Sequence, residues 1–182
     1  MTVYNTGADS ANTAVRAFLT KVGEFYLARS FNTGSGRGKA DWARIKDKVF
    51  KGKCSYCEDE NAKLQIEHLI MFNRSEYGLH HPGNIVPICA KCNKRNRKSD
   101  KTYMNWLEQL EYVCKEHGEG GKFEQRKNRI LKHIRDEKYP ELSKEEHHAI
   151  RVIANSLYEN TKSELEKSLD MYKQLDKAFV ER

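Results

Sequence analysis

The chain has 182 residues, of which 38% are hydrophobic and 32% are charged. This length suits one domain with or without a helical extension and excludes a multi-domain machine. Lysine and arginine number 33 against 26 aspartates and glutamates, and the net charge of +7 suggests an anionic partner. The first 13 residues contain no basic residue, and the chain has no 18-residue apolar stretch. We therefore expect a soluble, cytoplasmic protein without a secretory signal or a membrane span.

The first predicted element is an amphipathic helix between residues 12 and 29. Its apolar residues recur at three- and four-residue steps and therefore share one face. They are Val15, Phe18, Leu19, Val22, Phe25 and Tyr26. A loop and a short second helix are expected to follow, so that residues 1–52 form an N-terminal helical segment.

The loop after this helix, residues 32–39, is rich in glycine. It does not match the Walker pattern for phosphate binding, because threonine stands at the first glycine position and alanine follows the lysine. We interpret the loop as a flexible linker. The short helix is predicted to start with Asp41 as its N-cap and to end at Gly52.

The central segment, residues 53–98, has a different texture. Short β-prone pieces at 63–68 and 85–88 alternate with glycine, asparagine, proline and cysteine. Two strands this short do not form a stable unit in water without a cross-link. We therefore expect the chemistry of the protein, and a structural staple, to lie in this segment.

The C-terminal region, residues 99–182, is predicted to be helical. Expected helices end at Gly118 and before Pro140, and a capping-box pattern of Ser143 and Glu146 starts a third helix. A last helix presents an apolar stripe made of Leu165, Leu169, Tyr172, Leu175 and Phe179. The sequence leaves open whether these apolar faces pack on the first helix and its neighbours or on another protein chain.

Four of the five cysteines occur as two Cys-x-x-Cys pairs. This spacing favours a metal over disulfides in a chain of this length, and two pairs supply the four sulfurs of a tetrahedral zinc site. The predicted ligands are Cys54, Cys57, Cys89 and Cys92. A site closed by four thiolates has no open position for a substrate, so this Zn2+ would be structural. The fifth cysteine, Cys114, lies on a predicted apolar helix face and is interpreted as a buried, inert thiol.

Polar residues stand in a fixed order between and after the cysteine pairs. Glu67 and His68 end the first predicted strand, Asn84 precedes the second, and Asn93 follows the last cysteine. With the strings CSYC, IEHLI, GNIVPICAKCN and KRNRKSD, this order resembles the HNH, or ββα-metal, endonucleases. In that family an acidic residue and a histidine end the first strand, an asparagine precedes the second, and a histidine or asparagine lies on the helix.

The resemblance implies a role for each of these residues. Glu67 and Asn93 would bind a catalytic Mg2+ or Mn2+ through oxygen, the ligand atom that such hard cations prefer. His68 would be the general base that activates water, since a neutral imidazole accepts a proton at physiological pH. Asn84 would orient the loop that carries the histidine by bonding to its backbone.

Three details of this site stay open in the sequence. Asn96 competes with Asn93 for the ligand role because it lies one helical turn further on. His80 and His81 are interpreted as solvated loop residues and are left out of the site. Neighbouring strand residues point to opposite faces, so Glu67 and His68 share one site only if the strand bends or ends there.

Basic residues crowd the segment after the second cysteine pair, which is expected to be the helix of the ββα-metal module. The predicted nucleic-acid contacts are Lys91, Lys94, Arg95, Arg97 and Lys98. Contacts of this kind grip phosphates without reading sequence and weaken strongly with salt.

The sequence thus predicts an α+β protein, mainly α, with a central zinc-bound ββα-metal (HNH) module flanked by amphipathic helices. The expected function is a metal-dependent endonuclease that hydrolyses phosphodiester bonds in nucleic acid, DNA in preference to RNA, in restriction or antiviral defence. One alternative is a non-catalytic, zinc-stapled nucleic-acid-binding module. Another is a nuclease subunit that needs a partner protein such as an ATPase. A homodimer or a protein partner would bind through the C-terminal helices.

Overall fold

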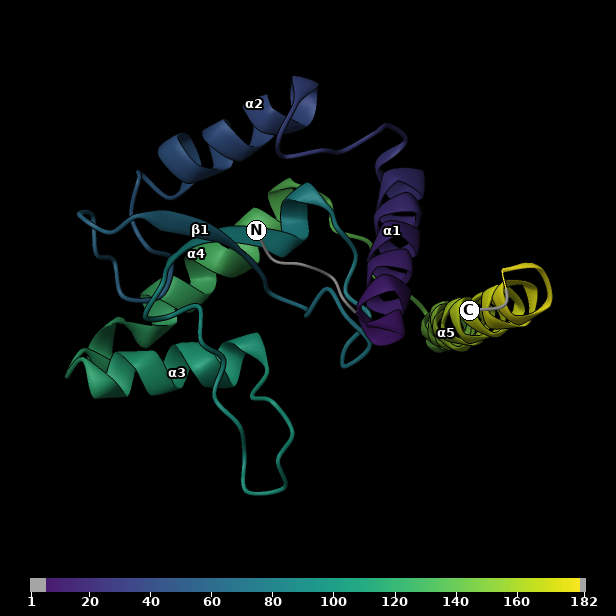
Figure 1. The fold of residues 1–182 in the computed structure, drawn as a ribbon. Coiled ribbons are helices and arrows are strands. Elements are labelled where there is room, and N and C mark those ends of the chain that lie inside the picture. Colours follow the sequence, from purple (N-terminus) through teal and green to yellow (C-terminus); the bar gives the residue numbers. More distant parts are fainter. Residues whose placement is uncertain (1–5, 181–182) are drawn as a thin grey trace.

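The computed structural model describes residues 6–180, so the outermost residues of both predicted terminal segments lie outside the description. The described chain is mainly helical with one two-stranded sheet. Its elements are α1 (Gly7–Leu27), α2 (Gly36–Arg44), β1 (Leu64–His68), β2 (Ile85–Cys89), α3 (Trp106–Glu116), α4 (Phe123–Asp136) and α5 (Lys144–Phe179). Figure 1 shows α2, α3 and α4 around the sheet and α1 between the sheet and α5.

The two strands pair antiparallel, as a single small sheet. The register sets His68 opposite Ile85 and Leu64 opposite Cys89. All five residues of β2 are buried, which fits its continuous apolar sequence. This pairing brings the end of the first strand next to the start of the second, where Asn84 stands.

One hydrophobic core joins all three segments that the sequence separates. Phe50 comes from the N-terminal segment, Ile88 from the central segment, and Leu110 and Ile130 from the C-terminal region. All four are fully buried. Cys114 is also fully buried in this core, as predicted for an inert thiol. The boundaries at residues 52 and 98 therefore do not divide independent cores.

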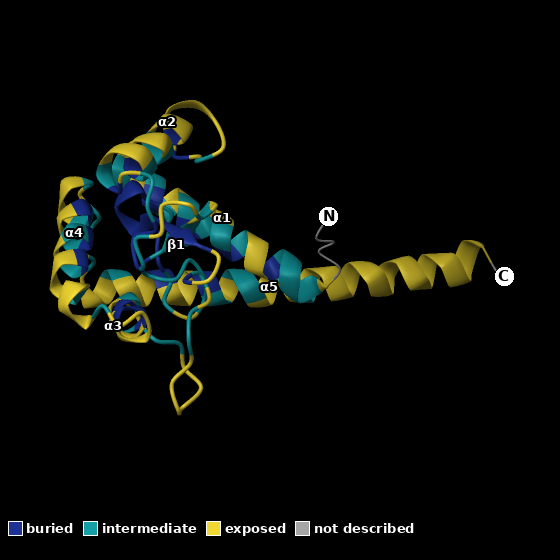
Figure 2. Cartoon of the chain, turned by 90° about the vertical axis from the view of Figure 1, so that its left-hand side faces the viewer, coloured by how far each residue is buried: buried dark blue, intermediate teal, exposed yellow. Residues whose placement is uncertain are grey.

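A second, smaller core packs α1 against the first half of α5. Val15 and Leu19 of α1 meet Ile150 and Ala154 of α5, together with Leu79 from the loop between the strands. Of the two options that the sequence left open, packing on the first helix is therefore correct for this half of α5. The second half projects away from the rest of the molecule and is exposed (Figure 2).

The prediction for the second helix was wrong at its start. Helix α2 begins at Gly36, inside the segment interpreted as a linker, with Ser35 rather than Asp41 at the N-cap. A Cβ at Gly38 would lie 2.4 Å from the Asn32 carbonyl oxygen, so glycine permits a close backbone contact here instead of flexibility. The helix passes into a single π-helical turn at Ile45–Val49.

The prediction of two separate helices after Ser143 was also wrong. The capping box of Ser143 and Glu146 is present, but α5 then continues for 36 residues. No proline or glycine interrupts residues 144–179, so nothing in this stretch ends the helix. No helix within residues 6–180 is long and apolar enough to cross a membrane.

The third correction concerns the basic segment after the second cysteine pair. Residues 90–105 form turns and a loop, with an isolated β-bridge between Arg97 and Tyr103, and the next helix starts only at Trp106. The segment carries several like charges and asparagines, which weaken a helix. The bridge between Arg97 and Tyr103 and the ion pair of Arg95 with Glu67 hold it in a loop instead.

Candidate metal centre and adjoining cavity

The four paired cysteines converge at one end of the sheet. Their Sγ atoms all lie within 4.8 Å of one another. Cys54, Cys89 and Cys92 are buried, and Cys57 is partly buried. The first pair lies in the turns before β1, and the second pair lies at the end of β2, so the sheet itself brings the two pairs together.

The thiol cluster has the dimensions of a tetrahedral metal site. Zn–S bonds of about 2.3 Å place neighbouring sulfurs about 3.8 Å apart, and the Sγ atoms of Cys57 and Cys89 are 3.7 Å apart. The backbone N–H of Cys89 points at the Cys54 sulfur from 3.4 Å. The hydrogen bond between Cys54 and Cys92 lowers the pKa of Cys54 and raises that of Cys92, and burial raises the pKa of Cys57. The cluster can therefore hold a metal ion.

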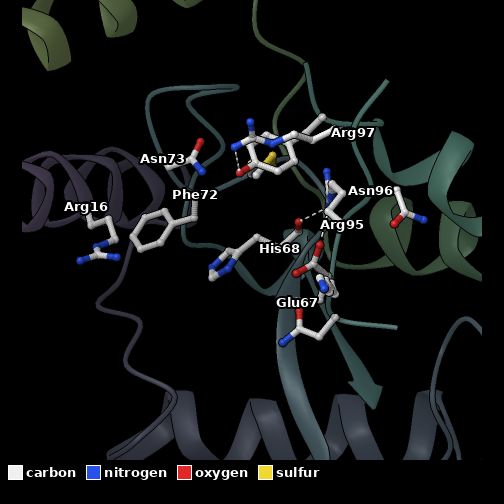
Figure 3. Close-up of a pocket in the computed structure, with 12 residues that line it drawn as sticks. Arg16, Glu67, His68, Phe72, Asn73, Arg95, Asn96 and Arg97 are labelled. Carbon is white, nitrogen blue, oxygen red and sulfur yellow. Dashed lines mark hydrogen bonds and ion pairs between the residues drawn. The ribbon is translucent and has the colours of Figure 1, made fainter. Parts of the chain in front are cut away.

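A cavity of about 690 Å³ opens beside the end of β1. It is lined by three of the four residues to which the resemblance assigns a role in the reaction, Glu67, His68 and Asn93, and also by Asn96. Strand β1 ends at His68, and the side chains of Glu67 and His68 both line the cavity there. Figure 3 shows Arg16 and Phe72 on one side of His68, with Glu67 and Arg95 on the other.

The carboxylate of Glu67 is held by a buried arginine. Arg95 is 5% exposed and donates to Glu67 Oε1 at 2.5 Å, and the same nitrogen donates to the carbonyls of His68 and Leu69. The other side of its guanidinium faces Glu76 at 3.5 Å. Burial raises the pKa of Glu67, and the charge of Arg95 opposes this shift. Only Oε1 of Glu67 takes part in this ion pair.

His68 forms its side-chain hydrogen bond with another histidine. Its Nε2 lies 2.9 Å from Nδ1 of His80, and its ring stacks on Phe72 with ring centres 4.7 Å apart. Burial is the main cause that lowers the pKa of His68 to about 3, and His80 and Arg95 add to it. The imidazole is therefore neutral at physiological pH.

Asn84 ties the two ends of the loop between the strands. Its Nδ2 donates to the carbonyls of Ile70 and Leu79, both at 2.9 Å, and its Oδ1 accepts from the Ile70 N–H at 2.8 Å. The side chain is buried and does not line the cavity. This bonding is the arrangement that the resemblance implies for Asn84.

The two candidate asparagines after the second cysteine pair differ in their contacts. The side chain of Asn93 donates from Nδ2 to Gln65 at 2.8 Å, which leaves its carbonyl oxygen outside this bond. Asn96 is held through its backbone N–H, which donates to Gln109. Both residues line the cavity.

The predicted basic contacts do not form one uniform surface. Lys94 and Arg97 line the cavity, whereas Lys91 is exposed outside it and Lys98 pairs with Glu108 at 2.8 Å. Arg95 also lines the cavity, and its side chain is 5% exposed and held in an ion pair with Glu67. The cause is the path of the loop, which turns this one arginine inward.

Several residues of the cavity carry no signal in the sequence. Arg16 comes from α1, more than 50 positions before the motif, and Phe72 and Asn73 come from the loop after β1. Tyr103 is brought in by its bridge to Arg97, whose guanidinium stacks over the tyrosine ring at 4.8 Å. The interpretation of His80 and His81 as solvated loop residues was wrong, because His80 is hydrogen-bonded to His68 and His81 is 1% exposed.

Comparisons of the chain with protein-family models, with curated proteins and with solved structures give no match.

Proposed function

We propose that the protein is a metal-dependent endonuclease that hydrolyses phosphodiester bonds in DNA. The observation that carries this proposal is one cavity lined by a carboxylate, an imidazole and an amide, in a chain that also gathers four thiols at the other end of the sheet. Lysine and arginine side chains line the same cavity, and the chain as a whole is basic. A cluster of four thiolates is the donor set of structural Zn2+, so the residues that remain for chemistry are those of the cavity.

In this proposal the residues have distinct tasks. His68 lines the cavity and accepts the proton of a water molecule that attacks phosphorus in line. Oε2 of Glu67 and the carbonyl oxygen of Asn93 are hard ligands for Mg2+ or Mn2+, and neither oxygen takes part in the bonds to Arg95 or Gln65. A bound ion of this kind supplies stabilisation of the leaving oxygen. Asn84 holds the loop that follows His68.

The cavity is also lined by side chains of the kinds that bind a nucleic-acid strand. Arg16, Lys94 and Arg97 offer positive charge to phosphates, and Phe72 and Tyr103 offer aromatic faces on which a base can stack. These contacts read no base edge, so we expect binding that depends weakly on sequence and strongly on salt.

The exposed half of α5 is proposed to bind a second copy of the chain. Leu165, Leu169, Tyr172, Leu175 and Phe179 form a stripe whose members are each at least 43% exposed. Glu166 and Lys173 lie seven positions apart and so share one edge of this stripe. In an antiparallel pair of α5 helices, each Glu166 meets Lys173 of the other copy, which gives complementary charges with no other protein required.

The experiment that tests the nuclease proposal is incubation of supercoiled plasmid with the wild-type protein and with His68→Ala, each in Mg2+ or in EDTA. Wild type with Mg2+ is expected to nick or linearise the plasmid, and His68→Ala is expected to be slower by about 10²–10⁴-fold. His147→Ala is the matched control, because that histidine is exposed on α5. Cleavage by His68→Ala at the wild-type rate would remove His68 as the base.

The same assay separates the two candidate metal ligands. Asn93→Ala should reduce cleavage and Asn96→Ala should not, with both melting temperatures near that of wild type. The reverse result would move the ligand to Asn96. DNA that is shifted on a gel but never cut, across Mg2+ and Mn2+ and several sequences, would favour the non-catalytic binding module.

A further inference from the structure

The contact between His68 and His80 has a chemical consequence for the proposed base. A neutral imidazole carries one N–H and one basic nitrogen. Since Nε2 of His68 is engaged by Nδ1 of His80 at 2.9 Å, only Nδ1 of His68 is left to take a proton from water. This nitrogen is basic only when the proton of the ring sits on Nε2, so the hydrogen bond decides whether His68 can act.

His80 is fixed in place from several sides. Its ring packs against Phe31 at 4.8 Å and against Phe72 at 5.4 Å, measured between ring centres. Helix α1 comes so close that a Cβ at Gly23 would lie 2.4 Å from the His80 carbonyl oxygen. The preceding carbonyl, of Leu79, accepts from Asn84. An imidazole held this firmly can impose one orientation on its partner.

The charge state of His80 is compatible with an acceptor role. Burial lowers its pKa, and the nearby carboxylate of Glu24 opposes that shift. Glu24 is itself tied to the chain by accepting the Phe31 N–H at 2.9 Å. A neutral His80 keeps a lone pair on one ring nitrogen, which a protonated His80 would lack.

We propose that His80 is a positioning residue for the hydrolysis reaction. Its Nδ1 accepts the hydrogen of His68 Nε2 and so holds His68 in the tautomer whose Nδ1 is basic and lies outside this hydrogen bond. The proposal rests on the proposed nuclease function. It adds a residue outside the Glu67, His68, Asn84 and Asn93 set, and it gives the packing of α1 against this loop a role in catalysis.

Two substitutions at position 80 test this role. His80→Asn keeps an acceptor one bond from Cγ, where Nδ1 stands, whereas His80→Leu has a similar volume and no acceptor. His80→Leu is expected to lower kcat about 100-fold with KM within twofold of wild type, because a wrong tautomer removes the base without removing substrate contacts. His80→Asn is expected to recover most of the loss. Equal rates for wild type and His80→Leu would overturn the proposal, and so would equal losses in both variants.

A measurement that needs no activity tests the same hydrogen bond. In the wild-type protein, 15N chemical shifts of the histidine rings are expected to show the His68 proton on Nε2, and His80→Leu should give a mixture of tautomers. A proton on Nδ1 of His68 in the wild type would overturn the proposal. Melting temperature and bound zinc report whether His80→Leu is folded. If the wild type itself cuts no DNA while this tautomer is found, the nuclease proposal fails and the hydrogen bond stands.

Discussion

At the scale of single residues, buried histidines hold the turn that leads into β2. Nδ1 of His81 accepts from the Gly83 N–H at 3.1 Å, and Nε2 of His133 lies 3.1 Å and 3.0 Å from the carbonyls of Pro82 and Ile85. Both rings are 1% exposed. Burial lowers the pKa of both, that of His81 to about 4. Protonation of His81 on Nδ1 would remove the acceptor of the Gly83 N–H, so this hydrogen bond needs a neutral His81 ring.

This arrangement predicts a loss of stability in mild acid. In the unfolded chain His81 has its ordinary pKa of about 6.5, so between pH 6.5 and 4 the unfolded state binds a proton that the folded state does not. Each pH unit in that window then costs about 1.4 kcal/mol for this one residue, and above pH 6.5 the effect vanishes. His81→Asn keeps an acceptor for Gly83 and should reduce this slope. Chemical unfolding of the wild type and of His81→Asn at pH 7 and pH 5 measures how the free energy of unfolding changes with pH. The same change in both proteins would contradict the prediction.

The sequence was informative for residues whose role depends on local order. Asn84 stands directly before β2, and the register alone brings it next to the end of β1. Arg95 and His80 could not be placed in this way, because their partners are fixed by the path of two loops. In a stretch rich in lysine and arginine, no pattern distinguishes the one arginine that is 5% exposed from its solvated neighbours.

At the scale of elements, the sheet is too small to persist unaided. Two strands of five residues contribute few ladder hydrogen bonds, and a hairpin of this size is marginal in water. The thiol cluster closes the end of the sheet where Cys89 pairs with Leu64. We therefore expect metal binding there to be coupled to folding of the central segment.

Removing one thiolate is expected to unfold this segment. Cys54→Ser should bind less than one zinc ion per chain and lose its cooperative melting transition, since structural zinc contributes about 10–16 kcal/mol to folding in small domains. Cys114→Ser is the matched control: its sulfur is equally buried but accepts from Arg126 instead of joining the cluster. Zinc content by atomic emission and melting by circular dichroism measure both. A normal melting curve for zinc-free Cys54→Ser would contradict the coupling.

The sequence predicted the existence of the helices and strands more accurately than their boundaries. Both strands and the capping box of α5 follow from local pattern, which the structure confirms. The start of α2 and the missing helix after Cys92 depend on contacts at a distance: Gly38 against Asn32, and Arg95 against Glu67. Periodicity contains no information about such contacts.

At the scale of the whole molecule, the helices outside the central segment help to build the cavity. Helix α1 supplies Arg16 to the lining and holds the His80 loop, and it is itself packed against the first half of α5. Tyr26 of α1 donates to Glu146 of α5 at 2.7 Å across this contact. Through α1, the first half of α5 therefore belongs to the scaffold that supports the cavity.

The remaining half of α5 is exposed in the described part of the chain, and its apolar stripe predicts self-association. Light scattering of the wild type is expected to give twice the monomer mass. Leu169→Asp should give a monomer, because a carboxylate at the centre of the apolar seam is costly to bury. Gln174→Asp adds the same charge on the opposite face and should leave the dimer intact. The side chains of Leu169 and Gln174 are exposed and lie outside the monomer core, so the melting temperature of the single chain should change little.

Charge exchange tests the antiparallel direction of this dimer. Glu166→Lys should weaken association roughly tenfold, because it replaces two attractive contacts by two repulsive ones across the two-fold axis. The double variant with Glu166→Lys and Lys173→Glu restores both contacts and should restore the affinity. Recovery in the double variant requires that position 166 of one copy faces position 173 of the other, which a parallel pair does not provide. A wild-type monomer at all concentrations, or a double variant no tighter than Glu166→Lys, would contradict the antiparallel dimer.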